Sequence, residues 1–256
     1  MLSGESQWLL LFIVSLISNL LSSLAGGGTG LLQLPAIIWM GLPFSIALAT
    51  HKVSTVAMGV GALFYAIKHK NLTKNIMLLL LIAGTPGVLL GANLVLYIPE
   101  KLGLVSLGIL NIGLAVYSIS NKSLGQEASS LVSKSFSHTA IGAAVLFIIG
   151  VVNGSLTSGT GLLVTLWLIR WYGLDYRTAI RHTLVIVGIL WNFVGAASLA
   201  LAGEVNWSWA TILIPGALIG SWLGVILGGR IDNYNIKKLF ELAAFVAGLQ
   251  LLSKAW

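Results

Sequence analysis

Six long stretches of this chain contain no Asp, Glu, Lys or Arg, and they restrict the fold more than any other feature. They cover residues 6–50, 75–99, 102–121, 135–169, 182–203 and 205–229. Each reaches or exceeds the roughly 20 apolar residues that cross a bilayer as a helix. Only 8% of the 256 residues are charged, against about 25% in a soluble domain. The sequence therefore excludes a soluble enzyme, a nucleic-acid-binding protein and a disordered chain, and predicts an all-α integral membrane protein.

Glycine-rich breaks interrupt two of these stretches, at residues 26–30 and 157–161. The apolar pieces that follow them, up to Met40 and Trp171, are too short to cross a membrane alone. A break at membrane depth is tolerated only where protein or a water-filled cavity covers the backbone. We therefore predict a broken, re-entrant helix pair at each place. Three transmembrane helices follow each pair, near 43–67, 75–97 and 101–119, and near 174–202, 207–228 and 235–253.

Three motifs recur in the same order in the two halves of the chain. Gly28-Thr29-Gly30-Leu31-Leu32 matches Gly159-Thr160-Gly161-Leu162-Leu163, and Gly41-Leu42 matches Gly173-Leu174. Pro86-Gly87-Val88-Leu89-Leu90-Gly91 matches Pro215-Gly216-Ala217-Leu218-Ile219-Gly220. Three anchors in one order indicate an internal duplication. We assign residues 1–121 to the first repeat, 122–137 to a cytoplasmic linker, and 138–256 to the second repeat.

The basic residues predict that the two repeats are inverted relative to each other. In the first half, the basic residues Lys68, Lys70 and Lys74 follow the helix predicted near 43–67. In the second half, the basic residues Arg170, Arg177 and Arg181 lie around the connection between the broken pair and the next helix. Because Lys and Arg collect on the cytoplasmic side, corresponding loops of the two halves face opposite sides. The predicted topology places the N-terminus and the C-terminus outside, and it leaves open whether the first helix of each half spans fully.

The two breaks are the first candidates for a binding site. A helix that begins after a break has unpaired backbone N–H groups and the positive end of a dipole, and both attract anions. Two inverted breaks can enclose one site near the middle of the bilayer. The alternative is that the glycines only permit tight turns. The candidate residues are Gly28, Thr29, Gly30, Ser158, Thr160 and Gly161.

Polar and ionisable residues inside the predicted spans are the second group of candidates. Thr50-His51-Lys52 and His182-Thr183 occupy similar places in the two halves, and Asn192 follows in the same span. A cation at membrane depth costs several kcal/mol unless it is paired or hydrated. Lys52 therefore indicates a binding role, or a side chain that snorkels to the interface. The histidines could equally be structural, and Asn19, Gln33, Asn153 and Asn192 could line a path or join helices.

Residue types that are absent from the predicted spans and motifs restrict the class of substrate and the kinds of reaction. No Asp or Glu lies near the middle of a predicted span, whereas carriers of Na⁺ or H⁺ place acids there. The substrate is therefore predicted to be an anion. The sequence contains no phosphate-binding loop, no zinc-ligand spacing, no acid to orient a serine–histidine pair, and no cysteine. We expect no enzyme activity, no cofactor and no metal.

These motifs resemble the sulfite exporter TauE/SafE family over nearly the whole chain. The resemblance rests on Gly-Gly-Gly-Thr-Gly with Pro35, Ala-Thr-His-Lys at 49–52, the repeated Gly-Thr-Gly, His182-Thr183, and both Pro-Gly-x-x-x-Gly helices. It implies a bacterial-type inner-membrane permease for sulfite, thiosulfate or sulfonates. Relatives often have Asn where His51 stands, and many have Lys where this chain has Leu184.

The resulting hypothesis is an exporter of small anions that works by alternating access around the two breaks. The backbone at the breaks, with Thr29, Ser158 and Thr160, would bind the anion, and Lys52, His51 and His182 would supply positive charge. An anion channel and an importer of an organic anion are the alternatives. The expected partners are the substrate anion and the lipid bilayer, not nucleic acid, and a homo-oligomer stays open.

Overall fold

The computed structural model describes residues 4–25, 28–68, 72–120, 136–228 and 233–255. Their regular structure is entirely helical, which confirms the predicted all-α class. The first half contains α1 (Gly4–Ala25), α2 (Thr29–Trp39), α3 (Phe44–Lys68), α4 (Lys74–Leu79), the π-helical turn η1 (Leu80–Gly84), α5 (Thr85–Leu94), the short η2 (Val95–Tyr97) and α6 (Glu100–Ser120). The second contains α7 (Phe136–Ser155), α8 (Thr160–Tyr172), α9 (Tyr176–His182), the π-helical η3 (Thr183–Trp191), α10 (Asn192–Leu201), α11 (Trp207–Leu227) and α12 (Asn233–Lys254).

Seven helices of the described chain are long and apolar enough to cross a membrane. They are Glu5–Leu24, Phe44–Phe64, Lys74–Tyr97, Glu100–Tyr117, Ser137–Ser155, Thr178–Leu201 and Trp207–Leu227. The first helix of each half is among them. The span expected near 235–253 forms α12 but is not one of the seven, and its sequence carries Lys237, Lys238 and Glu241 near its start. Large apolar side chains such as Ile82 and Phe193 lie on the outer surface, as contact with lipid requires.

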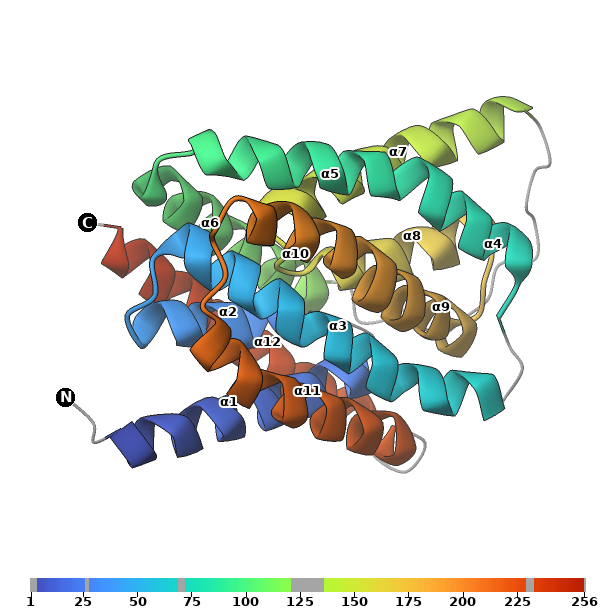
Figure 1. Cartoon of the computed structure of the whole chain (residues 1–256). Helices are drawn as coiled ribbons and strands as arrows, with labels where there is room; N and C mark the ends of the chain where they lie inside the picture. Colours follow the sequence, from blue (N-terminus) through green and yellow to red (C-terminus); the bar gives the residue numbers. More distant parts are fainter. Residues whose placement is uncertain (1–3, 26–27, 69–71, 121–135, 229–232, 256) are drawn as a thin grey trace.

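The broken helix pairs enter the bundle from opposite ends (Figure 1). The pair α1–α2 begins at the end where both termini lie, and α7–α8 begins at the other end. The termini thus share one end of the bundle, as the predicted topology requires. The inverted repeat and the side of the membrane that this end faces remain predictions. Most of the linker predicted at 122–137 lies outside the described residues.

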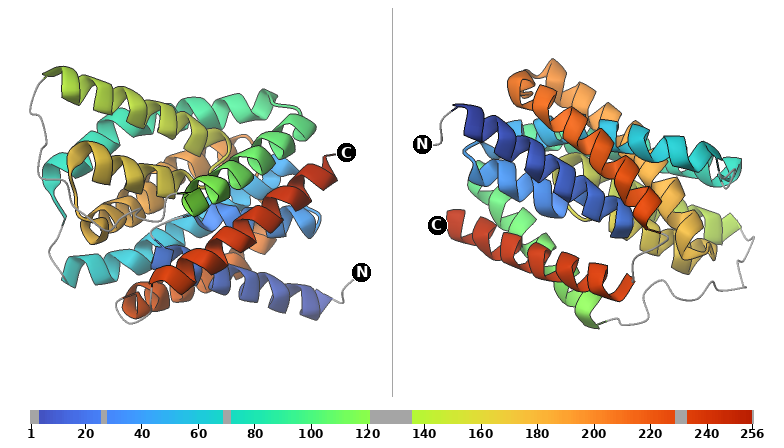
Figure 2. Two further views of the ribbon diagram at one scale, coloured as in Figure 1. Left: turned by 180° about the vertical axis from the view of Figure 1, so that it is seen from behind. Right: turned by 90° about the horizontal axis from the view of Figure 1, so that it is seen from below.

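Each Pro-Gly-x-x-x-Gly helix packs against the first helix of the broken pair in the other half. In α11, a Cβ added to Gly220 would lie 2.3 Å from the Leu16 backbone oxygen of α1. In α5, a Cβ added to Gly91 would lie 2.1 Å from the Val151 oxygen of α7. Such distances require glycine, because any side chain would push the helix backbones apart. Figure 2 shows α12 lying along α6, so the two halves interlock rather than standing side by side.

The two π-helical segments contact each other deep in the bundle. The Trp191 indole N–H of η3 donates to the Leu80 oxygen of η1 at 3.0 Å. The indole occupies the space beside Gly84, where a Cβ would lie 1.7 Å from it. A π-helical turn leaves a helix wider and redirects its side chains, and it often occurs at functional sites. In this chain η3 forms one wall of the cavity described below.

Candidate functional site

The two glycine-rich breaks meet in the middle of the molecule. Gly28 and Gly159 precede α2 and α8 with φ of 112° and 66°, in the left-handed region that favours glycine. A Cβ added to Gly30 would lie 2.8 Å from the Ser158 Cα, so backbone touches backbone at this point. The predicted approach of the two breaks is therefore present in the structure.

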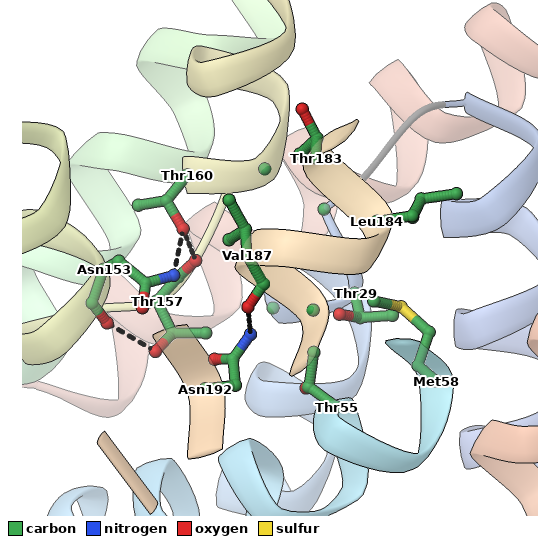
Figure 3. Close-up of a pocket in the computed structure, with 14 residues that line it drawn as sticks. Thr29, Thr55, Met58, Asn153, Thr157, Thr160, Thr183, Leu184, Val187 and Asn192 are labelled. Carbon is green, nitrogen blue, oxygen red and sulfur yellow. Dashed lines mark hydrogen bonds between the residues drawn. The ribbon is translucent and has the colours of Figure 1, made fainter. Parts of the chain in front are cut away.

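A small cavity of about 20 Å³ lies at this meeting point (Figure 3). Its wall comes from the starts of α2 and α8, from α3, from α7 and its break, and from η3 and α10. Among the predicted site residues it is lined by Gly28, Thr29, Gly30, Thr160, Gly161, Thr183 and Asn192. None of its lining residues is acidic.

Two helix N-termini open into this cavity without a side-chain cap. The backbone N–H of Leu31 bonds to the Gly28 oxygen, and that of Thr160 bonds to the Thr157 oxygen. The other first-turn N–H groups have no partner within their helices. Neither α2 nor α8 has a side chain that caps its start. Both positive dipole ends therefore act on the same small volume.

Lys52 lies directly behind the cavity wall and is completely buried. Its Nζ donates to the Asn153 backbone oxygen at 2.7 Å, to Asn153 Oδ1 at 3.3 Å and to Asn192 Oδ1 at 3.5 Å. Its stem passes over Gly195, where a Cβ would lie 3.0 Å from the lysine Cδ and Cε. The side chain thus points into the bundle, and the snorkelling alternative is wrong. Its charge acts on the cavity through the two asparagines.

Hydrogen bonds fix the asparagines and the second break in place (Figure 3). Asn153 Nδ2 donates to Thr160 Oγ1 at 2.8 Å, and Thr160 Oγ1 donates to the Thr157 oxygen at 2.6 Å. Thr157 Oγ1 in turn donates to the Asn153 oxygen at 2.7 Å. Asn192 Nδ2 donates to the Val187 oxygen at 2.7 Å. The side chains between Lys52 and the cavity are therefore held before any ligand binds.

His51 is buried and does not line the cavity itself. Its Nδ1 lies 2.9 Å from Gln33 Oε1, and its Nε2 lies 3.2 Å from Thr55 Oγ1. Gln33 Nε2 donates to Ser15 Oγ and Ser54 Oγ, so its oxygen is the acceptor and His51 Nδ1 the donor. This histidine therefore joins α3 to α1 and α2.

Three other predicted residues also bond outside the cavity. His182 donates from Nδ1 to the Thr178 oxygen and accepts the Thr73 backbone N–H at Nε2, both at 2.8 Å. Thr50 accepts the Asn206 backbone N–H at 3.0 Å. Ser158 Oγ donates to Asn111 Oδ1 of α6. His182 and Thr50 thus connect helices to loops, and Ser158 anchors the second break.

Part of the cavity wall consists of residues that the sequence did not indicate. Thr55, Met58, Leu184, Val187 and Gly188 also line it. Thr55 stands three residues after Lys52, so helical spacing alone could have placed it on the same side of α3. The apolar members carry no comparable signal, because a membrane helix is apolar on every side. Among the described residues no group of three His, Cys, Asp or Glu could hold a metal.

Comparison with known proteins agrees with this architecture. The family model described as "Sulfite exporter TauE/SafE" matches residues 11–251. A "Probable membrane transporter protein" of Haemophilus influenzae is 25% identical over 84% of this chain and 82% of its own length. The "Probable membrane transporter protein YunE" of Bacillus subtilis is 22% identical over 96% and 97%. The corresponding protein YfcA of Escherichia coli K12 is 26% identical over 90% and 82%.

No solved structure matches the chain. The family match covers both broken pairs and every helix that lines the cavity. The relatives match across most of their own lengths, and each is a membrane transporter by its name. The chain is therefore a multi-pass membrane transporter of the sulfite exporter TauE/SafE family.

Proposed function

We propose that this protein exports small anions such as sulfite, thiosulfate or sulfonates by alternating access around the cavity between α2 and α8. One observation carries the proposal: two uncapped helix N-termini open into a single cavity that has Lys52 behind its wall and no acid in it. A cation in this place would meet two positive helix ends and the charge of Lys52. An anion would meet hydrogen-bond donors and a compensating charge.

The size and electrostatics of the cavity favour a small oxyanion. Each helix N-terminus acts as about half a positive charge, and Lys52 adds a full one. These charges are strong in a dry interior, where the effective dielectric constant is far below that of water. The cavity has about 20 Å³ of room for water-sized molecules, which is space for about one water molecule, so only a small ligand would fit without a change of conformation. Thr29 and the N–H groups of the first turns would bind the oxygens of the anion.

The arrangement of the broken pairs supports alternating access. Because α1–α2 and α7–α8 enter from opposite ends, a tilt of one half against the other would expose the cavity at one end at a time. The proposal includes the inverted relation of the halves and termini on the outer side. A monovalent anion moving outward gains about 2.3 kcal/mol per 100 mV of inside-negative potential. Export therefore needs no coupling ion.

Replacement of Lys52 tests this function. We expect Lys52→Ala to reduce sulfite or thiosulfate flux in proteoliposomes by about 100-fold, because a lost ion contact of about 3 kcal/mol corresponds to that factor. The elution profile in detergent should stay unchanged. The matched control is Lys74→Ala, at an exposed lysine in the first turn of α4, which should keep its flux.

Two results would count against the proposal. Undiminished flux in Lys52→Ala would remove Lys52 from the site. Currents in planar bilayers that rise without saturation as the anion concentration increases would identify an anion channel instead of a carrier.

A further inference from the structure

The hydrogen bonds of Lys52 fit an ammonium ion and not a neutral amine. An ammonium has three N–H donors and no acceptor. Its Nζ has three partners among the described residues, all of them oxygens: two from Asn153 and one from Asn192. A neutral amine has only two N–H donors, so it could not donate to all three oxygens. The protein therefore supplies hydrogen-bond acceptors for the charged form of Lys52 even before an anion binds.

Within the described part of the chain, no acidic side chain bonds to this ammonium. The groups around it come from α7 and α10 and are neutral amides and a glycine. The nearest titratable group on its own helix is His51, whose ring bonds to Gln33 and Thr55. Glu241 is the one buried acid of the described chain. It lies in α12, which packs on α6, α2 and α1, and it has interactions of its own.

We propose that Lys52 is a permanent counter-charge for a singly charged anion. With the anion bound, the site then has no net charge, and without it the site carries one positive charge. In a carrier, the membrane potential acts on the step in which charge moves through the field. The loaded carrier therefore reorients independently of voltage, and the empty carrier is drawn back toward a negative interior. This inference rests on the proposed function. It specifies the step of the transport cycle on which the membrane potential acts.

The full chain in proteoliposomes allows the two steps to be separated. The probe is radiolabelled methanesulfonate, which is singly charged, with voltage set by a potassium gradient and valinomycin. In counterflow, with the anion on both sides, only the loaded carrier needs to reorient. In efflux into anion-free buffer, the empty carrier must return. We expect 100 mV, negative inside, to change counterflow less than about twofold and to speed efflux several-fold, up to about 50-fold for a full charge.

Thiosulfate serves as an internal control that needs no mutation. It is doubly charged, so a site with one fixed positive charge becomes negative when it is loaded. Counterflow of thiosulfate should therefore depend on voltage in the same vesicles in which methanesulfonate counterflow does not. For each anion that Lys52→Arg transports, counterflow should depend on voltage as it does in the original protein, because arginine does not lose its proton.

The outcomes separate this inference from the proposed function. Methanesulfonate counterflow that follows voltage as strongly as efflux does would overturn the fixed counter-charge while leaving transport intact. Efflux that is independent of voltage and changes the internal pH would show that Lys52 releases its proton, which also overturns it. If neither anion moves in either mode at zero voltage, the proposed function and this inference both fail.

Discussion

The start of α3 and the starts of α2 and α8 present the same backbone groups, but only the first is neutralised. Glu100 accepts the Phe44 backbone N–H at 3.2 Å, and Glu204 accepts the Ser45 hydroxyl. Two carboxylates from distant parts of the chain thus lie at the positive end of α3. At α2 and α8, a glycine occupies the capping position, and neither helix start has a side-chain cap.

Under the proposed function, the difference indicates where an anion would bind. A carboxylate is itself an oxyanion, and at a helix N-terminus it takes the place that a substrate would occupy. Other helix starts are also capped by side-chain oxygens, α9 by Asp175 and α11 by Asn206. The two helix starts in the cavity are left without such groups. In the proposed function, their lack of caps leaves free the place that a substrate anion would occupy.

The strongest test gives a cavity helix the carboxylate that α3 has. We expect Thr29→Asp to lower anion flux by about 100-fold or more. Two like charges 4 Å apart near a protein surface repel by about 4 kcal/mol. Thermal stability in detergent should be unchanged or higher, because an acid in the first turn favours the helix.

The matched control is Thr29→Asn, which has the same shape without the charge and should lose less than about tenfold in flux. Equal loss in Thr29→Asp and Thr29→Asn would show that the shape of the side chain matters and not its charge. The comparison between the two kinds of helix start would then fail.

A weaker effect is expected when the carboxylate is removed from α3. Glu100→Gln should lower the free energy of unfolding by about 1–2 kcal/mol, because it removes a charged acceptor from a backbone N–H. The apparent melting temperature in detergent should fall by a few degrees. Flux should stay within about twofold of the original. A large loss of flux without loss of stability would instead place the start of α3 on the substrate path.

The smallest effect is expected at Asp175, which caps α9 outside the membrane spans. Partial burial opposes ionisation, but hydrogen bonds from Thr178 and the charge of Arg181 outweigh it and hold the pKa of Asp175 below its usual value. Its contribution to stability is therefore present above the unfolded pKa of about 3.9 and is lost as the pH falls through the folded one. Asp175→Asn should reduce stability by less than about 0.5 kcal/mol at pH 7.

Melting curves as a function of pH check this prediction. The difference between Asp175→Asn and the original chain should disappear as the pH falls below about 4. A difference that grows on acidification would contradict the assigned cause.

The helices of this fold could be predicted from the sequence because charge and glycine mark their ends. The uncharged runs and the breaks at Gly28 and Gly159 place the helices within a few residues of their observed bounds. The π-helical segments η1 and η3 were not predicted. They depend on the fit of Trp191 against Gly84 and Leu80, which are far apart in sequence and brought together only by packing.

The site was predicted in part, and helix geometry explains the rest. Neighbouring residues on a helix point about 100° apart, so Thr50, His51 and Lys52 cannot all face one cavity. Thr50 reaches Asn206, His51 reaches Gln33, and Lys52 alone reaches the asparagines at the cavity. The repeated polar motif does include Lys52, which lies behind the cavity wall, and Thr183, which lines it. It could not show which of its members faces the cavity.

The bond between Lys254 and Ile38 has a consequence for the order of assembly. Lys254, near the end of α12, donates to the backbone oxygen of Ile38, at the C-terminal end of α2. The chain is made from its N-terminus, so α2 enters the membrane long before this partner exists. The helix that opens the cavity therefore completes its contacts only after the last helix is synthesised. Loss of Lys254 would therefore remove a contact of α2, in the first half of the protein.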